Sequence, residues 1–126
     1  MIGKLAEISL STRDPVFWIG APHAFEPEDP TAFQVEGSVF MGCQGDPRSV
    51  MFDFVCLTPT RLASHGWPDG FGHGDRTILS GRGLILMHSW DPRLLDRHIR
   101  GIVEVEGEHL DAIIDQIRLQ LICEDE

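Results

Sequence analysis

Residues 49–62 read Ser-Val-Met-Phe-Asp-Phe-Val-Cys-Leu-Thr-Pro-Thr-Arg-Leu, and this stretch decides the class of fold. Its first nine residues are an apolar run rich in residues with high β propensity, which predicts a strand at 49–57. Thr58 can accept a hydrogen bond from a free N–H of a first helical turn. Pro59 suits the first helical position, because its missing N–H is no loss there. The stretch therefore predicts a strand that runs directly into a short helix, which ends near Ser64.

Two earlier strands are expected, at 2–10 and at 32–42. In the strand at 2–10, four apolar side chains lie on one side, those of Ile2, Ala6, Ile8 and Leu10. Gln44-Gly45-Asp46-Pro47 predicts a turn, so the strands at 32–42 and 49–57 are expected to form an antiparallel hairpin. The prolines after Asp14 predict a long irregular connection over 16–31, although its aromatic side chains must dock in part on the body of the protein.

The C-terminal half continues with a short buried strand at 83–89. Asp91-Pro92 repeats the cap-and-proline signal and predicts a helix to about Glu104, followed by a second helix at about 108–116. The end of the chain alternates cleanly, which favours a closing strand near 118–123. A helix that continues to Leu121 is the alternative, because the apolar residues there also keep helical spacing.

This order of elements predicts one domain, residues 1–126, with an α+β fold. We expect a largely antiparallel sheet of about five strands, with two longer helices and one short helix packed on one face. The sequence pattern does not give the order of the strands in the sheet.

Charge restricts the class of partner. Twenty acidic residues against ten basic ones give a net charge of −10. Residues 101–126 hold eight acidic residues against Arg118 alone, a local balance of −7. Such a field repels nucleic acid and anionic membranes and attracts basic proteins or metal cations, although it also serves plain solubility. No apolar run reaches the roughly 18–20 residues that span a bilayer, so no membrane partner is expected.

The three cysteines, Cys43, Cys56 and Cys123, contain no Cys-x-x-Cys pair. Their odd number and wide spacing favour reduced thiols and a cytoplasmic protein. Cys56 lies inside a predicted strand, where a thiol is usually inert packing. Asp53 alternates with Phe52 and Phe54, so we expect it to face solvent or a backbone partner.

One loop concentrates the residue types that carry chemistry, His65-Gly-Trp-Pro-Asp69-Gly-Phe-Gly-His73-Gly-Asp75. Its histidines and carboxylates could ligate a divalent metal, and a small metal-dependent enzyme that uses His65, His73 and Asp75 is one alternative. Four glycines make the loop permissive rather than rigid, so we expect no metal, no other cofactor and no catalytic residues. A loop that contacts a partner, or a purely structural loop, is favoured instead.

Arg93, Arg97 and Arg100 share one face of the predicted helix that Asp91 opens. Asp96 and Glu104 are each four residues from Arg100, which favours ion pairs on a solvated helix face over a binding site.

Several short motifs together resemble the immunity protein 8 family. They are Pro27-Glu-Asp-Pro-Thr-Ala-Phe33, Met41-Gly42, Phe52-Asp-Phe54 and Thr58-Pro59 with Leu62. The strand at 84–87, the helix led by Asp91 and the acidic end continue the same order, so the resemblance covers about residues 26–126. Leu57 stands where the family has a cysteine, and Arg61 where it has an aromatic residue.

The resemblance implies a small cytoplasmic protein, encoded beside a polymorphic or contact-dependent bacterial toxin, that neutralises the toxin by stoichiometric binding. The expected partner is the C-terminal domain of the cognate toxin, a basic domain such as a nuclease. A few aromatic anchors should give affinity and carboxylates should give steering. The expected contact residues are Trp18, Trp67, Asp69, Phe71, Asp75, Glu104, Glu106 and Glu108. An acidic regulatory or assembly module is a further alternative.

Overall fold

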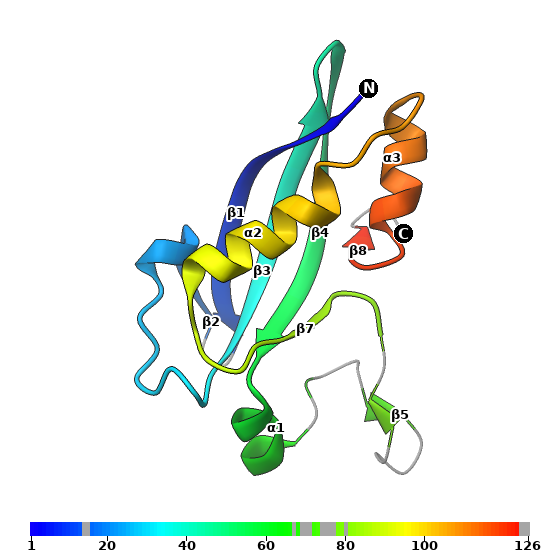
Figure 1. Ribbon diagram of the computed structural model, residues 1–126. Coiled ribbons are helices and arrows are strands. Elements are labelled where there is room, and N and C mark those ends of the chain that lie inside the picture. The colour runs from blue at the N-terminus through cyan, green and yellow to red at the C-terminus, as the bar shows by residue number, and fades with distance from the viewer. Residues whose placement is uncertain (14–15, 67, 69–71, 74–77, 80, 124–126) are drawn as a thin grey trace.

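The structure is a computed structural model that describes residues 1–13, 16–66, 68, 72–73, 78–79 and 81–123. Six strands form one sheet in the order β2-β1-β3-β4-β7, with the short β8 also paired to β4. Figure 1 shows α2 and α3 on one face of this sheet and α1 beyond the end of β4. The α+β class is therefore confirmed.

The strands of the main sheet are β1 (Gly3–Arg13), β2 (Val16–Gly20), β3 (Gln34–Cys43), β4 (Asp46–Leu57), β7 (Leu84–Leu86) and β8 (Ile122–Cys123). Two short strands, β5 (Gly72–His73) and β6 (Ile78–Leu79), pair with each other. The helices are η1 (Pro22–Ala24), α1 (Pro59–His65), α2 (Pro92–Val103) and α3 (Leu110–Ile117). Among the described helices, none is long and apolar enough to cross a membrane.

The hairpin of β3 and β4 forms the centre of the core and confirms the predicted pairing. Burial alternates strictly along β3, because one side of the strand faces the helices and the other remains open. The turn is limited to Gln44-Gly45, since Asp46 already pairs with Cys43. Gly45 takes a φ of 89°, which a glycine adopts without steric cost.

Thr58 follows the last residue of β4 and caps α1, as the sequence predicts. Its buried hydroxyl oxygen accepts a hydrogen bond from Arg61 N at 3.3 Å, and Pro59 is the first residue of α1. The same oxygen accepts from Phe33 N at 3.2 Å. Phe33 packs edge-to-face with Phe25 and Trp90, which docks the proline-rich connection on the body of the protein.

The expectation of an irregular segment over the whole of 16–31 was wrong. Residues 16–20 form the edge strand β2, which pairs antiparallel with β1. Val16-Phe-Trp-Ile is a run of residues with high β propensity, and the prolines that break regular structure begin only at Pro22. The residues before Pro22 therefore form a strand and not an irregular connection.

The expected inward set of the first strand was also partly wrong. Ile8 and Leu10 are buried, but Ile2 is 54% exposed and Ala6 is exposed. The register of β1 against β3 shifts between Leu5 and Glu7, so the strict alternation is broken there.

The C-terminal half follows the predicted order. Asp91 caps α2 by accepting from Arg93 N at 3.0 Å, and β7 is shorter than expected and parallel to β4. Helix α3 ends at Ile117, three residues of turn follow, and β8 pairs antiparallel with β4. The closing strand is therefore confirmed at 122–123, and the alternative of a helix to Leu121 was wrong.

Candidate functional site

The connection between α2 and α3 holds three exposed glutamates on a fixed main chain. Gly3 N donates to Val105 O at 3.0 Å, and Gly107 N donates to Met1 O at 2.9 Å. Gln116 Nε2 donates to Glu106 O at 2.9 Å. These hydrogen bonds tie the connection to the start of β1 and to α3, so its exposed side chains project from a rigid base.

The three glutamates differ in their electrostatic surroundings. Glu104 accepts from Arg100 Nη1 at 3.0 Å, and Arg100 Nε also donates to Asp96 at 2.9 Å. Hydrogen bonds to Asp96 and then to Glu104 raise the pKa of the Arg100 guanidinium. Within the part of the chain that the structure describes, the carboxylates of Glu106 and Glu108 have no hydrogen bond or ion pair. Their charge is therefore uncompensated.

Exposed apolar side chains lie beside these carboxylates. Ile2 is 54% exposed and forms an isolated bridge with Glu106, and Met1 is 44% exposed. The surface made by Met1, Ile2, Glu106 and Glu108 is called the acidic corner below, and Glu104, which Arg100 pairs, is not counted in it. Sequence patterning missed Ile2 as a surface residue, because its exposure depends on the bulge in β1 and on a bridge that joins distant segments.

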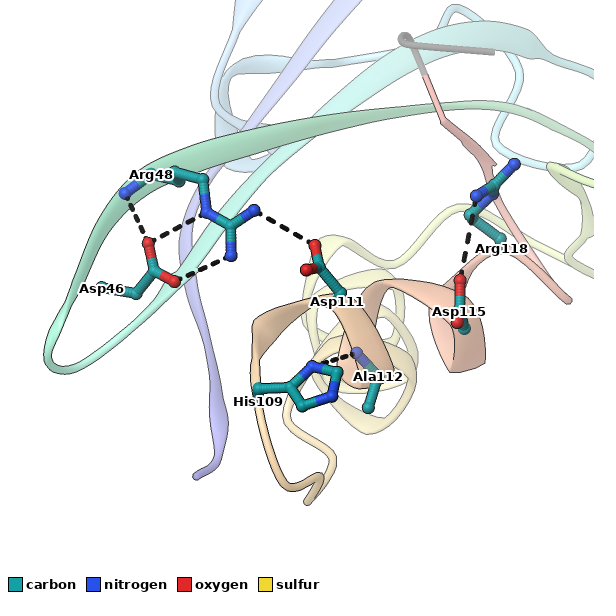
Figure 2. Close-up of polar contacts among 7 residues, drawn as sticks. All are labelled: Asp46, Arg48, His109, Asp111, Ala112, Asp115 and Arg118. Carbon is teal, nitrogen blue, oxygen red and sulfur yellow. Dashed lines mark hydrogen bonds and ion pairs between the residues drawn. The ribbon is translucent and has the colours of Figure 1, made fainter.

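Arg48 fixes the neighbouring hairpin against α3. Figure 2 shows its guanidinium between two carboxylates, with Nη2 2.9 Å from Asp46 Oδ2 and Nη1 3.1 Å from Asp111 Oδ1. The hydrogen bonds from Arg48 lower the pKa of Asp46, and those to Asp46 and Asp111 raise the pKa of Arg48. His109 Nδ1 accepts from Ala112 N at 3.2 Å and caps α3. These contacts neutralise part of the acidic surface next to the acidic corner.

Trp18 lies elsewhere on the molecule. It is 75% exposed on β2, and its Nε1 donates to Ser9 Oγ at 2.9 Å, so the exposed part of the ring is apolar. Figure 1 places β2 near the N-terminal end of α2, whereas the acidic corner lies at the C-terminal end. The structure therefore does not bring Trp18 together with the three glutamates.

The other expected contact residues, Trp67, Asp69, Phe71 and Asp75, lie outside the described residues. His65 is exposed on α1, with Nδ1 2.7 Å from Ser64 Oγ. No group of three or more His, Cys, Asp or Glu side chains that could hold a metal occurs among the described residues. The alternative enzyme site was expected to use His65, His73 and Asp75. Of these three residues, the structure describes the side chain of His65 alone.

Asp53 lies on the open face of the sheet, as expected, but its partner is a side chain and not the main chain. Ser38 Oγ donates to Asp53 at 3.0 Å. The three cysteines are free and buried, and burial raises the pKa of Cys56 to about 12. Arg100 pairs with Asp96 and Glu104 as expected.

A groove lies between β7 and α2. One cavity of about 750 Å³ lies between residues 84–89 and the N-terminal half of α2, and a second of about 430 Å³ adjoins it towards residues 119–121. Ile85 and Leu95 are buried in its floor. Its rim carries three exposed leucines, Leu86, Leu94 and Leu119. This surface is called the leucine groove below.

Comparison with family models, with curated proteins and with solved structures finds no match to this chain.

Proposed function

We propose that this chain is an immunity protein that binds the basic C-terminal domain of a bacterial toxin at the acidic corner and blocks it stoichiometrically. The observation that carries the proposal is the pair of uncompensated carboxylates, Glu106 and Glu108, on a hydrogen-bonded main chain beside the exposed Ile2. A cytoplasmic location and a gene beside that of the toxin are parts of the same proposal, and they rest on the resemblance in sequence.

Electrostatics supports a basic partner. A net charge of −10, with an excess in the last quarter of the chain, raises the local concentration of a positively charged protein. Carboxylates that already pair with arginine contribute little to this field at a distance. No arginine of the described residues pairs with Glu106 or Glu108, so these two carboxylates should dominate steering at this end of the molecule.

The rigid base and the apolar neighbours support tight binding rather than steering alone. A main chain that is already ordered loses little conformational freedom when a partner docks. Affinity in protein interfaces comes mostly from a few desolvated apolar anchors inside a polar rim. Ile2 can supply such an anchor within the acidic corner, with Glu106 and Glu108 at the rim.

The test uses the product of the neighbouring gene, with its C-terminal domain purified in an inactivated form. The double variant Glu106→Gln with Glu108→Gln should slow association by about 3- to 10-fold at low salt, with the difference shrinking as salt rises. The matched control is Asp96→Asn with Glu104→Gln, which removes the same number of charges from carboxylates that Arg100 already pairs.

Stopped-flow or surface-based kinetics gives the association rates. Equal slowing in the two double variants would remove the acidic corner from the interface. A lack of complex between the wild-type chain and the toxin domain, together with no protection of cells that express the toxin, would overturn the function itself.

A further inference from the structure

We propose that a hollow between η1 and the first turns of α2 binds an acidic peptide segment of a partner protein, through Arg93 and Arg97. Figure 1 shows η1, in blue, beside the N-terminal end of α2, which is the opposite end from the acidic corner. The inference does not depend on the toxin proposal, because it uses other residues and its test needs no toxin. This hollow, called the basic hollow below, has a volume of about 520 Å³ and is lined by Pro22, His23, Pro92, Arg93, Asp96, Arg97 and Arg100.

Charge complementarity is the first argument. Three of the ten basic residues of the chain line the basic hollow, all of them arginines, against one aspartate. Its lining therefore carries a formal charge of +2, with His23 counted as neutral, in a chain whose net charge is −10. Such a hollow attracts a short anionic group to one place, while the remaining surface repels it.

Two of the three arginines have donors to offer. The guanidinium of Arg100 is already hydrogen-bonded to two carboxylates, as the helical spacing predicted. Arg93 Nε lies 3.8 Å from Asp91 Oδ1, which is too long for a hydrogen bond, and its side chain is 90% exposed. Among the described residues, the exposed Arg97 has no hydrogen bond or ion pair. The guanidinium groups of Arg93 and Arg97 are therefore available to a ligand.

The spacing of these two arginines favours a peptide with two carboxylates. Arg93 and Arg97 are four residues apart on one helix, which places their Cβ atoms about 5–6 Å apart. Alternate side chains of an extended peptide lie on the same side, roughly 6.6 Å apart. A guanidinium group binds a carboxylate through two parallel hydrogen bonds. An extended segment with the pattern acidic-x-acidic can therefore place one carboxylate on each arginine, and the ring of His23 offers a further donor.

The wall of the basic hollow is ordered before any ligand arrives. Phe25 ends η1, and its carbonyl oxygen accepts from Trp90 Nε1 at 3.0 Å. The rings of Phe25 and Trp90 also pack edge-to-face with centroids 5.0 Å apart, and Trp90 directly precedes Asp91, the cap of α2. Pro22 and Pro92 add rigid apolar rings, on which the aliphatic stem of a glutamate can pack. A preformed hollow loses little conformational freedom when a peptide binds.

A short acidic segment fits this surface better than a nucleic acid does. Nucleic acid binding depends on many phosphate contacts made by lysine and arginine. The basic hollow offers two free arginines, and a long polyanion would also meet the field of a chain with a net charge of −10. A segment that carries two carboxylates can use the local positive charge without extending over the acidic surface.

The test is a titration of the full chain with the blocked peptide acetyl-Gly-Glu-Gly-Glu-Gly-amide, followed by proton–nitrogen correlation NMR. The Nε–Hε signals of Arg93 and Arg97 and the main-chain signal of His23 should shift and saturate, with a dissociation constant below about 5 mM at low salt. The matched peptide with glutamine in place of both glutamates should cause no saturable shift. Arg97→Gln should weaken binding of the acidic peptide by at least about 5-fold, because one carboxylate loses its partner.

Lys4→Gln is the matched control variant. Lys4 is exposed on β1, outside the basic hollow, so its replacement removes the same charge and should change the affinity by less than about 2-fold. Both variants alter exposed side chains, so circular dichroism should show an unchanged fold. The proposal is overturned if the acidic peptide causes no saturable shift at these signals, or if both variants weaken binding equally. Tighter binding of inorganic phosphate than of the acidic peptide would also overturn it and assign the hollow to phosphate.

Discussion

Gly37 is a position where one methyl group should be costly. It lies on the core side of β3, is buried, and pairs directly with Phe54 on β4. The Phe54 ring lies across the glycine, and a Cβ built there would overlap Cζ and both Cε atoms of that ring. Phe54 is only 2% exposed, so the ring has no free space into which it could move. Gly37→Ala therefore forces strain on the centre of the hairpin.

The magnitude follows from two opposing effects. Overpacking of a closed core costs about 1–3 kcal/mol. Alanine also restricts the unfolded chain relative to glycine, which returns about 0.4–1 kcal/mol. We expect Gly37→Ala to lower the free energy of unfolding by about 1–2 kcal/mol. Gly101→Ala is the matched control in α2, where a Cβ meets nothing within 4 Å, and it should raise stability by about 0.5–1 kcal/mol.

Urea unfolding followed by circular dichroism measures both variants, and the m-value should stay unchanged if only the native state is affected. Phe54→Leu provides a further check, because a smaller side chain should tolerate the added methyl group better than the phenyl ring does. The double variant, Gly37→Ala with Phe54→Leu, should then lose less stability than the sum of the two single changes. If Gly37→Ala matched the wild type, or if Gly101→Ala were equally destabilising, the stacking of Phe54 on Gly37 would be refuted.

Three further outcomes are expected. Thr58→Ala should cost about 1–3 kcal/mol in thermal unfolding, because two backbone N–H groups lose their acceptor, whereas Thr60→Ala on the exposed side of α1 should cost little. Cys56 should resist iodoacetamide at pH 8 until the chain is unfolded, since burial raises its pKa to about 12 and suppresses the thiolate; rapid native labelling would contradict this. Because Arg48 lowers the pKa of Asp46 below the ordinary 3.8, its contribution to stability is present above 3.8 and is lost as the pH falls through the lower folded value. The melting temperature of Asp46→Asn should therefore fall less with acid over that range than that of the wild type.

Short sequence signals correctly predicted the caps, the turn and the helical ion pairs, because these features depend on residues that are neighbours in the chain. The strand that runs into a capped helix at Thr58, the hairpin around Gly45 and the helix opened by Asp91 all depend on neighbouring residues. The ion pairs of Arg100 with Asp96 and Glu104 follow from helical spacing in the same way.

The features that sequence patterning missed depend on distant contacts. The exposure of Ile2 requires a bulge in β1 and a bridge to Glu106, which is far away in the chain. Arg48 and Asp111 are 63 residues apart, so their pairing could not be predicted from spacing. The parallel placement of β7 on β4 and the groove that this leaves beside α2 are likewise properties of the assembled sheet.

The same reasoning distinguishes two surfaces next to α2. Among the described residues, Glu106 and Glu108 keep an uncompensated charge at one end of α2, whereas the leucine groove along its flank is lined mainly by apolar side chains. Attraction of a basic protein to the first surface should weaken with salt, and association through the second should not. A salt titration of the complex with the toxin domain therefore reports which of the two surfaces binds it.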